Sequence, residues 1–177
     1  MIEKKKIKFN IISILTFVCL LLFSFKDNLL TSNFSRIANK SIKDYLLFFI
    51  ISLLFGVMMF FVLNKQHLHK LKYLGLISLI VGGIVPYNYL DTNALSSNLH
   101  LIGAYLSICV ILVCLLTSIY YFGVHHKKIA DILFGLVVFD ALIVLYLYGN
   151  YGFINSLAEL IYLLFVIILE AIIYNVL

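Results

Sequence analysis

Long apolar stretches alternate with short polar segments along almost the whole chain. Each stretch approaches the roughly 20 residues that a helix needs to cross the hydrocarbon core of a bilayer. The pattern predicts an all-α, polytopic integral membrane protein with six transmembrane helices. These helices are expected at about 9–25, 44–63, 71–89, 99–124, 129–149 and 155–176. Helices are expected rather than an open sheet because a segment in lipid has to satisfy its own backbone hydrogen bonds.

The composition supports this prediction. Of the 177 residues, 64% are hydrophobic and only 12% are charged, and the mean hydropathy is +1.12. A soluble domain is about half apolar and about a quarter charged, so this chain has too few polar groups to cover a soluble surface. We expect a single transmembrane domain over residues 1–177, located in a membrane as a multi-pass protein, with the plasma membrane of a bacterium as the expected location.

The basic residues fall unequally on the two sides of the predicted bundle. One side carries nine, namely Lys4, Lys5, Lys6, Lys8, Lys65, Lys70, Lys72, Lys127 and Lys128. The other carries four, namely Lys26, Arg36, Lys40 and Lys43. Cytoplasmic loops of membrane proteins are enriched in Lys and Arg, so the first side, with both termini, is expected in the cytoplasm. The net charge of +5 comes from these loops, and we expect no nucleic-acid partner.

The first apolar stretch follows a basic N-terminal segment, which is also the pattern of a signal peptide. Lys26 and Asp27 follow the stretch directly, where a cleavage site would have small residues. We therefore favour an uncleaved first helix.

Ionisable residues inside a span are costly in lipid and are therefore candidates for function. His100 near the outer end of the fourth span and Glu159 one turn into the sixth are predicted at similar depth. They could form an acid–base pair, bind a metal or sense pH, or simply join two helices by one hydrogen bond. Asp140 lies in the middle of the fifth span, either as a proton-relay or binding group or as a structural hydrogen-bonding group. Glu170 is near enough to the inner end of its span to reach the interface.

One face of the fourth span is small or weakly polar. Its members, at three- and four-residue steps, are His100, Ala104, Ser107, Ile111, Cys114 and Ser118. Such a stripe permits close packing of helices, or it lines a cavity with His100 at the mouth. A nucleophilic role for Ser107 would need a base from another helix, because two turns separate Ser107 from His100 by about 10 Å.

Metal ligands and cofactors are not expected. The three cysteines, Cys19, Cys109 and Cys114, lie in apolar stretches without the spacing of a zinc site or a disulfide framework. The histidine pairs at 67/69 and 125/126 lack the further ligands that a metal site needs.

Two short segments, Gly82-Gly-Ile-Val-Pro-Tyr-Asn88 and Ser97-Asn-Leu-His-Leu-Ile-Gly-Ala104, carry a family resemblance. The chain resembles the six-span Frag/DRAM/Sfk-like membrane proteins and a prokaryotic domain of unknown function related to them. Pro86, His100 and Ala104 match the family pattern of a proline at the outer end of the third span and a histidine opening the fourth. The resemblance implies a six-span fold and, for the eukaryotic members, a link to lipid remodelling and membrane organisation. It implies no particular reaction.

Three functions remain open from the sequence. The first is the binding of a membrane lipid or small amphiphile near the outer leaflet without catalysis, with His100 and Glu159 as polar anchors. Asp140, Ser107, and the outer-loop residues Asn88 and Asp91 are further ligand-binding candidates. The alternatives are a small-molecule transporter, or the substrate-binding subunit of an importer, and an intramembrane lipid-processing enzyme. Oligomerisation stays open as well.

Overall fold

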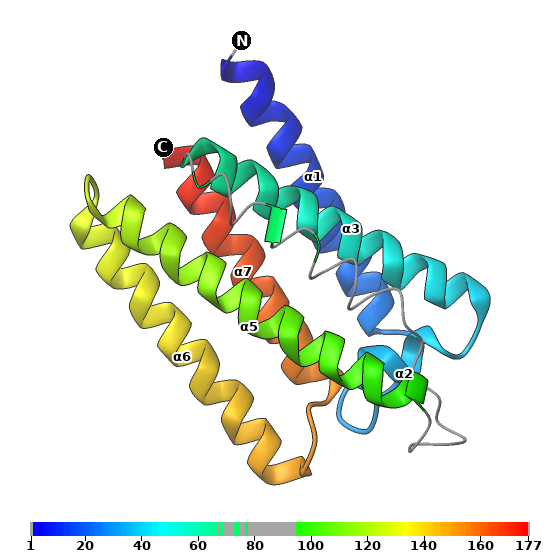
Figure 1. The fold of residues 1–177 in the computed structure, drawn as a ribbon. Helices are drawn as coiled ribbons and strands as arrows, with labels where there is room; N and C mark the ends of the chain where they lie inside the picture. Colours follow the sequence, from blue (N-terminus) through cyan, green and yellow to red (C-terminus); the bar gives the residue numbers. More distant parts are fainter. Residues whose placement is uncertain (1, 67, 69–72, 75–76, 78–94, 177) are drawn as a thin grey trace.

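The computed structural model describes residues 2–66, 68, 73–74, 77 and 95–176. Every regular secondary-structure element within these residues is an α-helix. The helices are α1 (Ile2–Ser24), α2 (Phe34–Ala38), α3 (Ile42–Lys65), α5 (Leu95–Gly123), α6 (Lys127–Tyr151) and α7 (Ser156–Val176). Figure 1 shows the long helices side by side in a bundle, with the short α2 at the end away from the two termini.

Five of these helices are long and apolar enough to cross a membrane: Lys5–Ser24 within α1, and α3, α5, α6 and α7. The prediction of membrane-spanning helices is confirmed for these five, and the chain is a multi-pass helical membrane protein. The span predicted at 71–89 falls mostly outside the described residues, as do Pro86, Asn88 and Asp91.

Contacts between helices define the two ends of the bundle. At the end with the termini, Lys6 Nζ donates to Asn175 O (2.9 Å) and Lys65 Nζ donates to Tyr174 O (2.6 Å). At the other end, the backbone N–H of Ser156 donates to Ser32 O at 2.7 Å. Between these two ends, α1 packs on α3 and α7, and α5 packs on α6 and α7.

Large apolar side chains fill the interior and also cover the outside. Phe9 and Tyr174 stack with ring centroids 4.0 Å apart at the end with the termini, and Phe55 is buried in the same core cluster. On the outer faces, side chains such as Leu22 and Ile102 are exposed. An exposed apolar surface of this extent is expected where the solvent is lipid.

The sequence did not predict α2, because residues 26–43 read as a polar loop. Asn33 caps the helix, with its side chain accepting from the backbone N–H of Arg36 at 2.8 Å. Phe34 and Ile37 then turn inward and are buried, with the Phe34 ring edge-on to Phe23 at 5.4 Å between centroids. One helical turn thus folds back onto the bundle, held by a cap and two apolar side chains.

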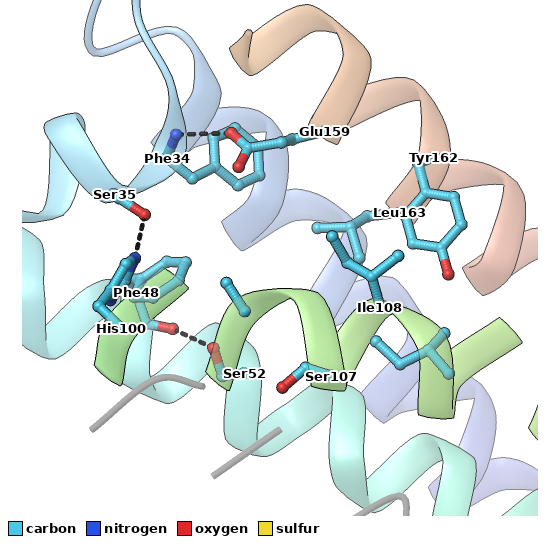
Figure 2. Close-up of a pocket in the computed structure, with 12 residues that line it drawn as sticks. Phe34, Ser35, Phe48, Ser52, His100, Ser107, Ile108, Glu159, Tyr162 and Leu163 are labelled. Carbon is cyan, nitrogen blue, oxygen red and sulfur yellow. Dashed lines mark hydrogen bonds between the residues drawn. The ribbon is translucent and has the colours of Figure 1, made fainter. Parts of the chain in front are cut away.

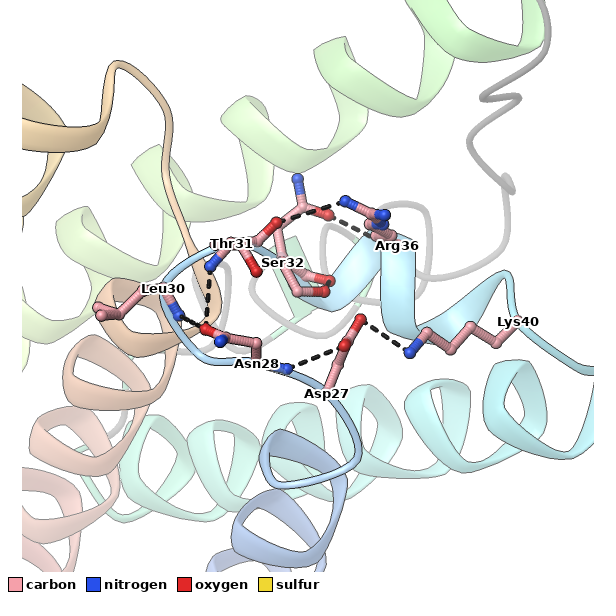
Figure 3. Close-up of polar contacts among 8 residues, drawn as sticks. Asp27, Asn28, Leu30, Thr31, Ser32, Arg36 and Lys40 are labelled. Carbon is pink, nitrogen blue, oxygen red and sulfur yellow. Dashed lines mark hydrogen bonds and ion pairs between the residues drawn. The ribbon is translucent and has the colours of Figure 1, made fainter.

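Polar contacts fix the loop that precedes α2 (Figure 3). Lys40 Nζ pairs with Asp27 Oδ2 at 2.8 Å, and the side chain of Asn28 accepts from the N–H of Leu30 at 2.9 Å and of Thr31 at 3.3 Å. The ammonium of Lys40, with smaller contributions from the backbone N–H of Asn28 and the hydroxyl of Ser32, lowers the pKa of Asp27 from its usual 3.8 to about 2. The loop is therefore an ordered support for α2.

Candidate functional site

His100 lies in the second turn of α5 and is buried, with 5% of its surface exposed. Its Nε2 atom shares a hydrogen bond with Ser35 Oγ of α2 at 2.6 Å (Figure 2). The hydroxyl donates when the ring carries its proton on Nδ1. Helix α5 is thereby joined to α2 through a histidine that the sequence singled out.

Glu159 lies in the first turn of α7 and also binds α2. Its Oε2 atom accepts from the backbone N–H of Phe34 at 2.6 Å (Figure 2). A carboxyl oxygen accepts such a bond from a backbone N–H whether or not the group is ionised. Two neighbouring residues of α2 are thus held by side chains from two different long helices. We call these four residues, Phe34, Ser35, His100 and Glu159, the α2 anchor.

The α2 anchor forms one end of a pocket of about 130 Å³ between α3, α5 and α7, which we call the anchor pocket. The apolar residues that line it are Phe34, Phe48, Ala104, Ile108, Ile111 and Leu163. Ile108 is 37% exposed, so this wall of the pocket reaches the outer surface of the bundle. The pocket therefore combines a polar end, an apolar wall and access from the side.

The fourth-span stripe is divided between the two roles that the sequence left open. His100, Ala104, Ser107 and Ile111 line the anchor pocket. Farther along the same face, Cys114 and Ser118 are buried in the interior. The hydroxyl of Ser107 donates to Gly103 O at 2.7 Å, as serines inside helices commonly do.

A second cavity, about 310 Å³, lies between α5, α6 and α7, and we call it the central cavity. Asp140 lines it and is 4% exposed. Asp140 Oδ1 and the hydroxyl of Tyr162 have no hydrogen-bond partner among the described residues. Ile108, Glu159 and Tyr162 line both the central cavity and the anchor pocket, so the two spaces adjoin.

Other candidate residues have different surroundings. Glu170, which the sequence allowed to reach the interface, is 2% exposed, and its Oε2 has no hydrogen-bond partner within the described part of the chain. The cysteines are free thiols. The described residues contain no group of three or more His, Cys, Asp or Glu side chains that could hold a metal ion.

Sequence reasoning brought His100 and Glu159 to the same depth, and the structure places both at the anchor pocket. The sequence did not indicate the two α2 residues to which they are hydrogen-bonded, Ser35 for His100 and Phe34 for Glu159. A signal was present, because Asn33 before Phe34-Ser-Arg-Ile is a helix-cap pattern. A single turn, however, is too short to show helical periodicity.

No protein-family model, curated protein or solved structure matches this chain. The resemblance carried by Pro86, His100 and Ala104 thus stays a prediction. Of these, His100 and Ala104 lie at the anchor pocket.

Proposed function

We propose that the anchor pocket binds a membrane amphiphile with a hydrogen-bonding head group. The observation that carries this proposal is the pairing of one polar end with one apolar wall in the same pocket. Ser35, His100 and Glu159 supply acceptors and a donor at the polar end. Ligand sites of this kind are mostly apolar, with few polar groups that fix orientation.

The apolar wall accommodates a hydrocarbon chain. Phe48, Ile111 and Leu163 line the pocket from three different long helices, and exposed Ile108 marks the side from which a lipid would enter. At about 130 Å³ the pocket holds a head group and the first part of a chain. The rest of the chain would then lie along the outer surface of the bundle in the bilayer.

The charge distribution supports a location near the outer leaflet. Four basic residues lie in the segment around α2, against nine on the side that the sequence predicts to contain the N-terminus. By the positive-inside rule the α2 end faces outward. The amphiphile would therefore come from the outer leaflet.

Photolabelling with a diazirine-bearing monoacylglycerol in vesicles tests the proposal. Ala104→Phe fills the pocket from its α5 wall, whereas Ile102→Phe places the same side chain on the lipid-facing side of the same helix, where Ile102 is 64% exposed. We expect labelling of the α5 and α7 segments in the wild type, at least about fivefold less in Ala104→Phe, and wild-type labelling in Ile102→Phe. Equal labelling of all three proteins would contradict the proposal.

The 2.6 Å contact between Ser35 Oγ and His100 Nε2 favours a second candidate function, hydrolysis of an ester in the same pocket. A nucleophilic hydroxyl within hydrogen-bond reach of a base is the arrangement that acyl transfer uses. Ser35 Oγ would attack the ester carbonyl carbon while its proton passes to His100 Nε2. His100 would return that proton to the departing alkoxide, and water would then release the acyl group from Ser35 as a carboxylic acid.

A fluorophosphonate probe separates this candidate from binding alone. If Ser35 is a nucleophile, the probe labels Ser35 in the wild type, Ser35→Ala abolishes the labelling, and His100→Gln lowers it at least about a hundredfold. Ser107→Ala is the control, because its hydroxyl is bonded to its own helix, and labelling should persist. Absence of labelling in the wild type would contradict hydrolysis and leave amphiphile binding in place.

A further inference from the structure

The central cavity has a buried carboxyl group in a mostly apolar lining. It lies among α5, α6 and α7, and the described residues that line it include no Lys, Arg or His. Asp140 is nevertheless buried in its wall, with Oδ1 lacking a hydrogen-bond partner within the described part of the chain. An ionised carboxylate in such surroundings is strongly unfavourable unless a cation pairs with it.

The lining is suited to a particular kind of cation. Tyr162 and Phe165 contribute aromatic rings to the cavity wall, and the faces of such rings attract cations. A small metal ion would need several oxygen ligands at defined distances, and the described residues provide no such cluster. An organic cation needs only one carboxylate for its ammonium group and apolar walls for its carbon skeleton.

The volume of the central cavity and its access from the bilayer also fit a hydrophobic organic cation. At about 310 Å³ the cavity is at the lower end of the range for small-molecule sites. Ala141 and Leu145 line it and are exposed on α6, so a lipid-soluble molecule can enter sideways from the bilayer.

We propose that the central cavity is a binding site for a hydrophobic amine, with the carboxylate of Asp140 as the counter-ion of its ammonium group. The amine would donate to Asp140 Oδ1, and its apolar body would lie against Val137, Val144 and Phe165. The site adjoins the anchor pocket through Ile108, Glu159 and Tyr162, but Asp140 lines the central cavity and not the anchor pocket. The proposal therefore does not depend on amphiphile binding at the anchor pocket.

Equilibrium binding of tritiated adamantylamine to the full chain in phosphatidylcholine nanodiscs tests the proposal. Adamantanol is a matched competitor, since it replaces the charged amine by a neutral hydroxyl on the same apolar cage. We expect saturable binding at neutral pH and displacement by adamantanol at least about tenfold weaker than by unlabelled adamantylamine. No saturable binding above that of empty nanodiscs, or equal displacement by the two competitors, would overturn the proposal.

Substitutions locate the site. Asp140→Asn keeps the shape but removes the charge and should weaken adamantylamine binding at least about tenfold. Glu170→Gln changes another buried carboxyl, one outside the described lining of the cavity, and should leave the affinity within about twofold. Ala141→Phe fills the cavity with Asp140 intact and should also weaken binding, which keeps the test decisive if Asp140→Asn folds poorly. Wild-type affinity in both Asp140→Asn and Ala141→Phe, or an equal loss in Glu170→Gln, would overturn the assignment.

Discussion

The anchor pocket and the central cavity adjoin and share three lining residues, but the polar groups that distinguish them differ in hydrogen bonding. At the α2 anchor, His100 and Glu159 each hold a short hydrogen bond to α2. In the central cavity, Asp140, which does not line the anchor pocket, has no such partner for its Oδ1 among the described residues. The sequence does not distinguish the two regions, because each is indicated only by ionisable residues inside predicted spans.

The difference separates two reasons for keeping a polar group in a membrane helix. A buried polar group that is bonded contributes to stability, whereas one left unbonded costs free energy. The α2 anchor is therefore expected to stabilise the fold at the same place where the proposed ligand would meet polar groups. Asp140 Oδ1 has no hydrogen-bond partner among the described residues and is expected to cost stability, which is consistent with a role in binding.

The largest effect is expected for Glu159→Ala. It removes the acceptor for the Phe34 N–H and should lower the free energy of unfolding by about 2 kcal/mol. Glu159→Gln keeps an acceptor and should lose less than half as much. Denaturant-dependent unfolding in detergent micelles measures both, and equal losses would contradict the role of the hydrogen bond.

Ser35→Ala should have a smaller effect in the same direction, about 1 kcal/mol, because it leaves the buried ring of His100 without this hydroxyl. Ser35→Thr retains the hydroxyl and serves as the control. If both variants unfold like the wild type, the contact does not contribute to stability.

At Asp140 we expect the opposite effect of a substitution, a gain in the free energy of unfolding. Asp140→Leu removes a carboxyl group whose Oδ1 has no hydrogen-bond partner among the described residues, and it adds apolar volume beside a cavity. It should raise the free energy of unfolding by up to about 1 kcal/mol. A destabilisation as large as that of Glu159→Ala would show that Asp140 is bonded in the folded protein, and the contrast between the two regions would fail.

The smallest effect concerns the loop that supports α2. Because Lys40 lowers the pKa of Asp27 from 3.8 to about 2, their pair stabilises the folded protein above pH 3.8, and this contribution is lost as the pH falls toward 2. Lys40 is 44% exposed, so the contribution is at most about 0.5 kcal/mol. Asp27→Asn should match the wild type at pH 2 and be slightly less stable near neutral pH. An equal difference at both values would contradict this assignment.

Hydropathy predicted the described long helices well, with both ends within two residues for α3, α6 and α7, whereas α1 and α5 begin earlier than predicted. The helix predicted from residue 9 begins at Ile2, and the one predicted from residue 99 begins at Leu95. Helices continue beyond the hydrocarbon core into polar sequence, such as the basic segment 4–8, where an apolar pattern no longer marks them. The third predicted span, at 71–89, lies mainly outside the described residues.

The candidate site could be predicted only in part. The rise of about 1.5 Å per residue brings His100 and Glu159 to the same depth, and both residues line the anchor pocket. Both side chains bind α2 because residues 25–33 bring α2 back against the long helices. No local sequence pattern specifies that course of the chain. For Asp140, burial in a span was predictable, whereas the adjoining cavity follows from how α5, α6 and α7 pack.

Whether the anchor pocket holds an amphiphile can be measured by native mass spectrometry of the protein released from micelles. With added monoacylglycerol, we expect one retained adduct on the wild type and on Ile102→Phe, and none on Ala104→Phe at equal folded yield. Retention of the adduct by Ala104→Phe at the wild-type level would contradict the proposal.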